Sequence, residues 1–392
     1  MKLSLAKIRL WVIIVALMLL SGGIGWRIGK NSLVRFPHDK TVRADLTLFW
    51  QVWDKLEENY LLKSKLQPQE MVWGAIKGMT QALDDPYTVF LPPADNQDSK
   101  DDLNGSFSGV GIELGYKEKT LAVIAPLSGT PAETAGIKAG DYILHIKDES
   151  KQVDQETTDL SLPQAVRLIR GPQGTTVELT ILREGIKEPQ VIKLTRETIV
   201  IKSVEVRWLD GNIALLKLSQ FGGRTAGEWD EAVKEITARA AVKGIILDLR
   251  NNPGGYLEGA IKYASEFLPA GKLIVKQAGK DGKIQTYTAS AGGRLTTQNL
   301  VVLINAGSAS SSEILAGALR DNQRAKLVGQ KSFGKGTIQE ALDLSENAGL
   351  HITTASWLTP NGTWVNDTHG LPPDVEIADD KAVAKGVELL KI

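Results

Sequence analysis

The chain has no cysteine, few histidines and no net charge, and each absence narrows what it can do. Without cysteine there can be no disulfide, no thiol nucleophile and no thiolate metal site. The histidines, His38, His145, His351 and His369, are far apart and lack ligand spacing, so we expect no metal and no cofactor. Lys plus Arg equals Asp plus Glu, 46 of each, so the charge balance does not favour nucleic acid as a partner.

A cationic N-terminus followed by an apolar run predicts a membrane anchor. MKLSLAKIR carries three positive charges and no acid, and residues 10–26 are apolar apart from one serine and three glycines. The run is near the lower limit for spanning a bilayer, about 17 residues. No clear cleavage pattern follows, so we favour an uncleaved single-pass anchor over a cleaved secretory signal and over a buried core helix. The positive-inside tendency then places the rest of the chain outside a bacterial cytoplasmic membrane, on the periplasmic or cell-surface side.

At 392 residues the chain suits two or three domains, and it opens with two predicted helices. The first, residues 44–62, has an apolar stripe that we expect to pack on the chain's own core or on a second copy: Leu46, Phe49, Trp50, Trp53, Leu56 and Tyr60. The second, residues 69–83, ends at Asp84-Asp85-Pro86-Tyr87, which we interpret as a turn and cap rather than as an acid/base or calcium site. Residues 92–104 are polar and predict a domain boundary.

Residues 106–197 predict a small β-rich domain. The expected strands are residues 107–114, 121–126, 141–146, 175–183 and 190–196, with a helix over 162–170 and glycines at the turns. The segments FSGVGIEL, GTPAETAGIKAGDYILHI and SLPQAVRLIRGPQGTTVELTILREG resemble a PDZ domain of the bacterial protease type. The resemblance implies that a loop of Ser108, Gly109, Val110, Gly111 and Ile112 offers backbone N–H groups to the carboxylate of a protein C-terminus. It implies that the bound tail lies beside a helix carrying Leu162, Val166 and Ile169.

From residue 199 onward, strands and helices alternate. Apolar runs at residues 213–218, 244–249 and 300–304 predict buried strands, and periodic segments at 225–240, 257–267 and 313–319 predict helices. Further strands are expected at 273–277, 283–287, 326–328 and 350–357, and a short helix at 381–390. The run at residues 244–249, bounded by turn residues, is typical of a strand buried on both faces.

Two strand-to-helix turns in this part suggest acyl transfer. Residues 251–255 carry paired glycines that let backbone N–H groups approach a ligand, and residues 308–312 place hydroxyl groups at a helix N-terminus. If the two strands are neighbours, the N–H groups of Gly255 and of the residue after the nucleophile would form an oxyanion hole. The alternative explanation of the serines is simple helix capping, with Ser310 or Ser311 as cap and Glu313 completing a capping box, and capping and catalysis can coexist.

The base is the harder question. His351 and His369 have no recognisable triad spacing, whereas Lys335 lies between two glycines. A lysine acts as a base only if burial lowers its pKa from about 10.4, and Gln339 could orient the neutral amine. The alternative is a solvated turn lysine. A second alternative is a nucleotide-binding P-loop over residues 329–335, but its eighth position is glycine instead of Ser or Thr.

Five motifs in order resemble the C-terminal processing peptidases, or tail-specific proteases. They are LDDPYTVF, DLRNNPGG, INAGSASSSEILAGALRDNQRA, LVGQKSFGKGTIQ, and WLTPNG with GLPPD, and they span residues 45–378 with the PDZ segment between them. The resemblance implies Ser310 as nucleophile, Lys335 as general base, Gln339 as its orienting partner, and the N–H groups of Gly255 and Ser311 as oxyanion donors. The position after the nucleophile is commonly alanine in that family, so Ser311 departs from the pattern.

The resemblance also implies an architecture. We expect an α/β multidomain protein with a Clp/crotonase-like α/β peptidase core, an inserted PDZ domain, an N-terminal helical segment and a transmembrane anchor. The expected boundaries are 1–30 for the anchor, 31–102 for the linker and helical region, 103–198 for the PDZ domain and 199–392 for the core. The implied function is cleavage near the C-terminal tails of extracytoplasmic proteins, with a homo-oligomer or an adaptor protein as possible partners. The alternative is an inactive PDZ scaffold that binds protein C-termini.

Overall fold

The computed structural model describes residues 44–117, 120–127, 129–158, 160 and 162–390. Contacts divide the chain into two compact units, Met1–Pro68 and Gln69–Ile392, each described by itself below. Across the described ranges, no helix is both long and apolar enough to cross a bilayer. The apolar run at residues 10–26, which carries the anchor prediction, lies outside them.

The first unit contains the helix predicted over residues 44–62, observed as α2 (Thr47–Asn59), and a short turn of 3₁₀ helix, η1 (Lys63–Lys65). The α2 helix starts where the Asp45 carboxylate accepts hydrogen bonds from the N–H and hydroxyl of Thr47, at 2.9 and 2.6 Å. No residue of α2 is buried. Its aromatic side chains contact each other instead, and the Trp50 and Trp53 ring centroids are 6.0 Å apart.

In the second unit, the helix predicted over 69–83 is α3 (Pro68–Gln81), and the predicted turn follows it. Residues 92–104, predicted as a polar domain boundary, contain a helix that the sequence did not predict, α4 (Pro93–Leu103), which follows strand β1 (Val89–Leu91). Its composition is too polar to produce an apolar stripe, so the sequence pattern did not reveal it. Proline at the first turn favours the helix start, and distant contacts hold it, such as the 2.6 Å ion pair of Lys100 with Asp343.

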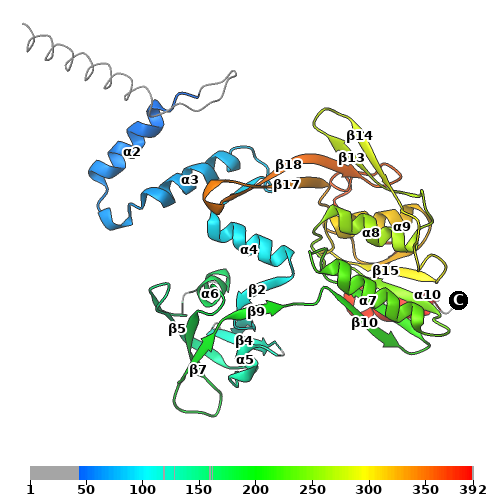
Figure 1. Ribbon diagram of the computed structural model, residues 1–392, viewed down its shortest axis with the longest axis horizontal. Helices are drawn as coiled ribbons and strands as arrows, with labels where there is room; N and C mark the ends of the chain where they lie inside the picture. The colour runs from blue at the N-terminus through cyan, green and yellow to red at the C-terminus, as the bar shows by residue number, and fades with distance from the viewer. Residues whose placement is uncertain (1–43, 118–119, 128, 159, 161, 391–392) are drawn as a thin grey trace, which may run out of the picture. The chain divides into compact units, whose positions relative to one another are not determined.

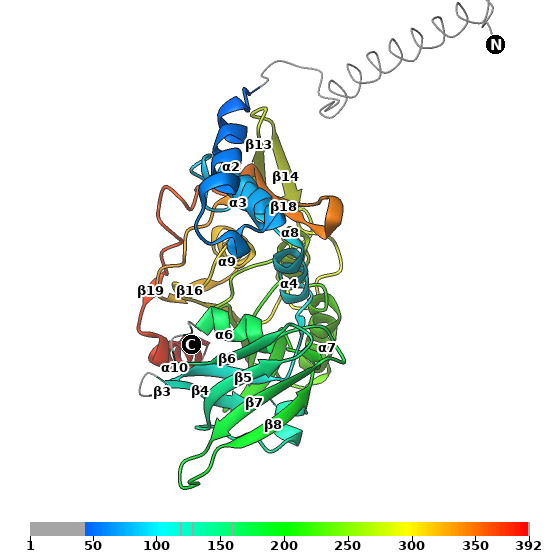
Figure 2. The same ribbon diagram turned by 90° about the vertical axis from the view of Figure 1, so that its left-hand side faces the viewer.

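The segment that resembles a PDZ domain forms a sheet in the order β3-β4-β5-β7-β8, with β6 beside β5 (Figure 2). Strands β2 and β9 pair separately and antiparallel. The elements are β2 (Ser106–Gly109), β3 (Ile112–Lys117), β4 (Thr120–Pro126), α5 (Pro131–Thr134), β5 (Tyr142–Asp148), β6 (Val153–Glu156), α6 (Leu162–Ile169), β7 (Thr176–Leu182), β8 (Gln190–Thr195) and β9 (Glu197–Val200). The boundary predicted at residue 198 falls inside β9.

The residues expected to bind a tail lie where the predicted loop and helix occur. Ser108 and Gly109 end β2, Val110 and Gly111 form the turn, and Ile112 begins β3. On α6, Leu162 and Val166 are partly exposed, whereas Ile169 is only 4% exposed and belongs to the core. The Val110 side chain is also buried, so only its backbone is available to a ligand.

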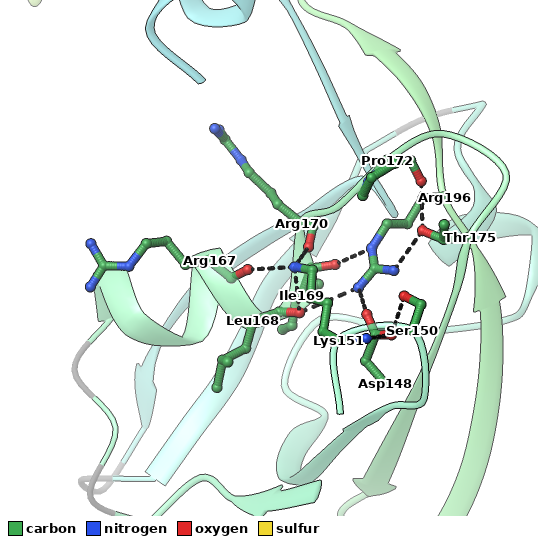
Figure 3. A network of polar contacts seen from close by, with 10 residues as sticks. All are labelled: Asp148, Ser150, Lys151, Arg167, Leu168, Ile169, Arg170, Pro172, Thr175 and Arg196. Atoms are coloured by element: carbon green, nitrogen blue, oxygen red, sulfur yellow. Dashed lines mark hydrogen bonds and ion pairs between the residues drawn. The ribbon is translucent and has the colours of Figure 1, made fainter. Parts of the chain in front are cut away.

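A buried charge cluster fixes the C-terminal end of α6 (Figure 3). Arg196 and Asp148 form an ion pair at 2.6 Å with both side chains fully buried. Arg196 Nε also donates to the Ile169 carbonyl at 2.7 Å, and Lys151 Nζ donates to the Arg167 carbonyl at 2.9 Å. Cations are favourable at a helix C-terminus, where unpaired carbonyls concentrate negative charge. Removing one partner of such a buried pair costs about 3–5 kcal/mol.

The remainder is an α/β core that carries helices α7, α8, α9 and α10 (Figure 1). It is built on a sheet in the order β10-β11-β12-β15-β16-β19. Pairs from β11 through β19 are parallel, and β10 is antiparallel to β11. The strands are β10 (Val204–Leu209), β11 (Ile213–Leu218), β12 (Gly244–Asp248), β15 (Leu300–Ile304), β16 (Lys326–Gly329) and β19 (Val375–Glu376). The strands predicted at residues 213–218, 244–249 and 300–304 are therefore confirmed as β11, β12 and β15.

Helices cover both faces of this sheet. The helices are α7 (Thr225–Ala238), α8 (Leu257–Phe267), α9 (Ser311–Asp321) and α10 (Asp379–Leu390). One apolar cluster joins the sheet to α7, α8 and α9, and a separate cluster on the opposite face joins it to α10. The first contains the Trp229 and Tyr263 rings, stacked with centroids 4.4 Å apart.

A second sheet has the order β1-β18-β13-β14, with β17 beside β18. Its later strands are β13 (Leu273–Gly279), β14 (Ile284–Thr288), β17 (Thr337–Asp343) and β18 (Gly349–Leu358), and η2 (Ser345–Asn347) connects the last two. All pairs in it are antiparallel. This sheet brings the segment before β1 close to the segment before β17.

Candidate active site

The serine and lysine segments lie at one edge of the parallel sheet. Strands β12, β15 and β16 are neighbours and parallel, so their carboxyl ends meet at the same edge. The turn after β12 is residues 249–256, the turn after β15 is 305–310, and the loop after β16 leads to Lys335. Ligands of open α/β sheets bind at this edge of the strands.

The first two turns fit closely against each other, as expected from the sequence. The Ala309 N–H donates to the Asn252 carbonyl at 3.0 Å. A Cβ atom on Gly254 would lie 2.8 Å from the Ala309 carbonyl oxygen and 2.9 Å from the Ser310 Cβ. Only glycine allows this approach, because any side chain at residue 254 would push the two turns apart.

One serine in this turn differs from the others. The hydroxyls of Ser308, Ser311 and Ser312 donate to the carbonyls of Leu249, Gly255 and Asn252, at 2.8, 2.9 and 2.8 Å, and all three serines are buried. Ser310 is partly exposed, and within the described part of the chain its hydroxyl donates no hydrogen bond. Ser310 therefore has the only hydroxyl in the turn that is both accessible and free to donate.

The backbone at Ser310 is strained. Its φ of 54° and ψ of −116° lie outside the regions that non-glycine residues favour. The Glu313 carboxylate holds this conformation by accepting the Ser310 N–H at 2.9 Å, which is one half of the predicted capping box. Such a sharp strand-to-helix turn lifts a side chain above the sheet edge, as nucleophile-bearing turns do.

Glu313 does more than cap a helix. It is fully buried, and it also accepts hydrogen bonds from the N–H groups of Gly334 and Lys335, at 2.7 and 2.9 Å, and from the Ser332 hydroxyl at 2.5 Å. Burial raises the pKa of this carboxyl, and the four donors act in the opposite direction. One carboxylate thus ties the serine turn to the lysine loop. The sequence offered only the local capping explanation for it.

The backbone of the lysine loop is fixed on both sides of Lys335. The Trp357 indole donates to the Lys335 carbonyl, and the Trp364 indole donates to the Gly336 carbonyl, both at 3.0 Å. A Cβ atom on Gly336 would be 2.5 Å from Trp364 Nε1, so the loop needs glycine there. Lys335 is partly buried, which excludes the alternative of a fully solvated turn lysine.

Burial lowers the pKa of the Lys335 amine, in the direction that a base requires, while the charges of Asp85 and Glu313 act in the opposite direction. Lys335 Nζ lies 4.7 Å from the centroid of the Tyr87 ring. Among the described residues, no hydrogen bond joins it to Ser310. The structure thus ties the serine turn to the lysine loop through Glu313, without a described hydrogen bond between the Ser310 and Lys335 side chains.

Gln339 also differs from expectation in this conformation. Its side-chain amide donates to the hydroxyls of Thr337 and Thr353, at 2.9 and 3.2 Å, and it makes no described hydrogen bond to Lys335. Its predicted contact with the amine is absent here. Gln339 lies on β17, two residues beyond Thr337 and four beyond Lys335.

Two backbone N–H groups are available beside Ser310. Gly255 forms a β-bridge with Phe221, but its own N–H takes no part in it. The two hydrogen bonds of the bridge run from the Phe221 N–H to the Gly254 carbonyl and from the Tyr256 N–H to the Phe221 carbonyl. The Ser311 N–H belongs to the first residue of α9, where a helix leaves its N–H groups unpaired. Both therefore remain free within the described structure, as an oxyanion hole requires.

The nucleotide-binding alternative does not fit this loop. A P-loop leads directly into a helix, whereas the residues after Lys335 form strand β17. Among the described histidines, His145 pairs with Asp154 at 2.7 Å, whereas His351 and His369 make no hydrogen bond to a carboxylate. Burial and the charge of the nearby Lys335 lower the pKa of His351. Among the described residues, no cluster of three or more potential ligands could hold a metal ion.

Comparisons with known proteins agree with this geometry. A family model described as Peptidase family S41 matches residues 212–377, and a PDZ domain model matches residues 123–183. The chain is 40% identical over 338 residues to the carboxyl-terminal-processing protease of Synechocystis sp., covering 84% of this chain and 76% of that protein. The chain belongs to the carboxy-terminal processing protease family.

Other members of the family give the same result. The carboxy-terminal-processing protease of Bartonella bacilliformis is 36% identical over 343 residues, covering 87% of this chain and 76% of that one. The solved photosystem II D1 C-terminal processing protease is 30% identical, with a TM-score of 0.52, over 88% of this chain and 97% of that one. The chain is therefore a serine protease of the carboxy-terminal processing type with a PDZ domain, the fold that binds protein C-terminal peptides.

Proposed function

We propose that this carboxy-terminal processing protease cuts unfolded proteins near their C-terminal tails with Ser310 as nucleophile and Lys335 as general base. The observation that carries the proposal is that Ser310 alone among the serines of its turn has an accessible hydroxyl that is free to donate. An inactive scaffold would have no need of a strained serine and a partly buried lysine in loops tied together by Glu313.

The chemistry proceeds in two steps. Neutral Lys335 takes the Ser310 proton as Oγ attacks the substrate carbonyl, and the N–H groups of Gly255 and Ser311 stabilise the oxyanion. The ammonium then gives its proton to the leaving amine, and an acyl-enzyme remains. A water molecule, deprotonated by the same lysine, attacks the ester and releases the shortened protein.

This mechanism needs a movement of Lys335. Its amine has no hydrogen bond to Ser310 in the described conformation, so its side chain must turn towards the nucleophile before proton transfer. To orient the Lys335 amine, the Gln339 side chain must likewise give up a hydrogen bond to the hydroxyl of Thr337 or Thr353 and form one with the amine. We assign this rearrangement to substrate binding, with occupancy of the PDZ groove as its trigger.

The test is cleavage of an unstructured protein with a free tail, compared with the same protein ending in an amide. The PDZ loop recognises a carboxylate, so the free-tailed substrate should have the lower KM, by roughly tenfold or more, since charged hydrogen bonds contribute about 1.5–3 kcal/mol. A tail shortened internally but still ending in a carboxylate is the control. Equal KM values for the carboxylate-ended and amide-ended substrates would contradict recognition of the tail. If neither substrate is cleaved, the result would support the inactive scaffold.

We also propose that the chain is anchored in the cytoplasmic membrane with its catalytic part outside the cytoplasm, on the basis of the cationic, apolar N-terminal sequence. A second proposal is that α2 pairs with a second copy or an adaptor, because its apolar side chains are exposed, including Trp50 at 52%. The full chain should sediment with membranes, be digested by protease added to spheroplasts, and run larger than one copy after detergent extraction. Recovery in the soluble fraction would contradict the anchor, and a monomeric mass would contradict the assembly.

A further inference from the structure

The turn before β1, residues 85–88, faces the side chain of Lys335, although the proposed reaction makes no use of it. Lys335 Nζ lies over the Tyr87 ring, 4.7 Å from its centroid. A cation over an aromatic face within about 6 Å is attracted by the ring electrons. The sequence predicted this turn, but only as the end of a helix.

The turn is held rigidly in place. One Asp85 carboxylate oxygen accepts the Tyr87 N–H at 3.0 Å, and the other accepts the Thr88 hydroxyl at 2.6 Å. Thr88 in turn accepts the Thr353 N–H at 3.1 Å, and β1 pairs with β18 from the next residue onward. The ring is therefore fixed on the same sheet that carries Gln339.

The charged groups around Lys335 act on its protonation in opposite directions. Asp85 and Glu313 stabilise the ammonium, whereas burial favours the neutral amine. His351 lies near enough to Lys335 for the positive charge of the ammonium to lower the pKa of the imidazole. Burial and the two carboxylates raise the pKa of the Tyr87 phenol, which keeps the ring neutral and its face electron-rich.

We propose that Tyr87, positioned by Asp85, is a resting place for the protonated side chain of Lys335. A lysine held there is charged and makes no hydrogen bond to Ser310, so it cannot act as base. The Lys335 side chain therefore leaves the Tyr87 ring and loses its proton in linked steps. The strength of the contact with the ring then sets the fraction of enzyme molecules whose Lys335 amine is neutral and able to act as base. This inference rests on the proposed role of Lys335, and it makes Tyr87 a positioning residue.

The first test is the pH dependence of kcat/KM for Tyr87→Leu, with Tyr87→Phe as the matched control that keeps the ring. Removing the ring should lower the apparent pKa of the base by about 0.4–1.5, the span that typical cation–π strengths convert to. Below that pKa the leucine variant should then be about 3–30-fold more active than the wild type. The phenylalanine variant should follow the wild type. An unchanged apparent pKa in Tyr87→Leu overturns the proposal.

A second test does not depend on activity. In a Ser310→Ala background, the acylation rate of the Lys335 amine by acetic anhydride, followed by mass spectrometry against pH, reports how much amine is neutral. Its midpoint should fall in Tyr87→Leu, and also in Asp85→Asn, which can still accept the Tyr87 N–H. If Tyr87→Leu does not fold, Tyr87→Met replaces it. Midpoints equal to the parent's refute the resting place, whereas cleavage that survives Lys335→Ala refutes the proposed reaction instead.

Discussion

Replacing Ser310 by alanine is expected to reduce cleavage of an unstructured protein by up to about 10⁶-fold, the loss that removing a serine nucleophile causes. The hydroxyl donates no hydrogen bond in the described structure but accepts one in the capping box of α9, so the variant should lose about 1 kcal/mol of stability and still fold. Cleavage is measured by gel or by a fluorescent substrate, and the fold by circular dichroism. A fluorophosphonate should label the wild-type chain at Ser310 and leave the variant unlabelled.

Ser312→Ala is the matched control, because it removes a hydroxyl two residues away. The Ser312 hydroxyl is buried and donates to the Asn252 carbonyl, which also accepts the Ala309 N–H. Its loss should lower stability by about 1 kcal/mol and leave most of the activity. Activity that survives in Ser310→Ala and disappears in Ser312→Ala would move the nucleophile to Ser312.

Replacing Lys335 by methionine should reduce kcat/KM by roughly 10²–10⁴-fold, the usual contribution of a general base. Methionine has a similar length without the amine, and burial already disfavours the charge of Lys335, so the variant should remain folded. Lys331→Met is the control, since Lys331 is exposed in the same loop. Comparable losses in both variants would show that the loop, and not the amine, matters.

The role of Lys335 as base also predicts the direction in which kcat/KM of the wild-type enzyme changes with pH. A base must be neutral, so kcat/KM should rise with pH as Lys335 loses its proton and become constant above its pKa. Because burial lowers that pKa, the plateau should begin below the ordinary lysine value of about 10.4. A midpoint at or above that ordinary value would contradict a desolvated lysine.

The strands and helices of the core were largely predictable because they follow strong local patterns. Residues 213–218 and 257–267 were predicted with the bounds that β11 and α8 have, since an apolar run and a periodic stripe each end at turn residues. The close fit between the turn after β12 and the turn after β15 could also be predicted, once these two buried strands were assumed to be neighbours in one sheet. Helix α4 escaped prediction because distant contacts, such as that of Asn96 with the Asn347 carbonyl, hold it in place of an apolar stripe.

The contacts around Lys335 were harder to predict. Glu313 satisfied a local capping pattern, and nothing in that pattern shows that it also binds three groups in residues 332–335. Asp85 and Tyr87 satisfied a local turn pattern in the same way. The side chain of Gln339 has more than one available partner, and a sequence does not show which one it holds in a given conformation.

The buried pair of Arg196 and Asp148 has a practical consequence for isolating the tail-binding domain. Arg196 is the residue between β8 and β9, so a fragment ended at the last residue of β8 would leave Asp148 buried without its cation. β9 in turn pairs with β2, which begins at Ser106. A fragment that preserves both the charge balance and the strand pairing must therefore extend at least from Ser106 to Val200.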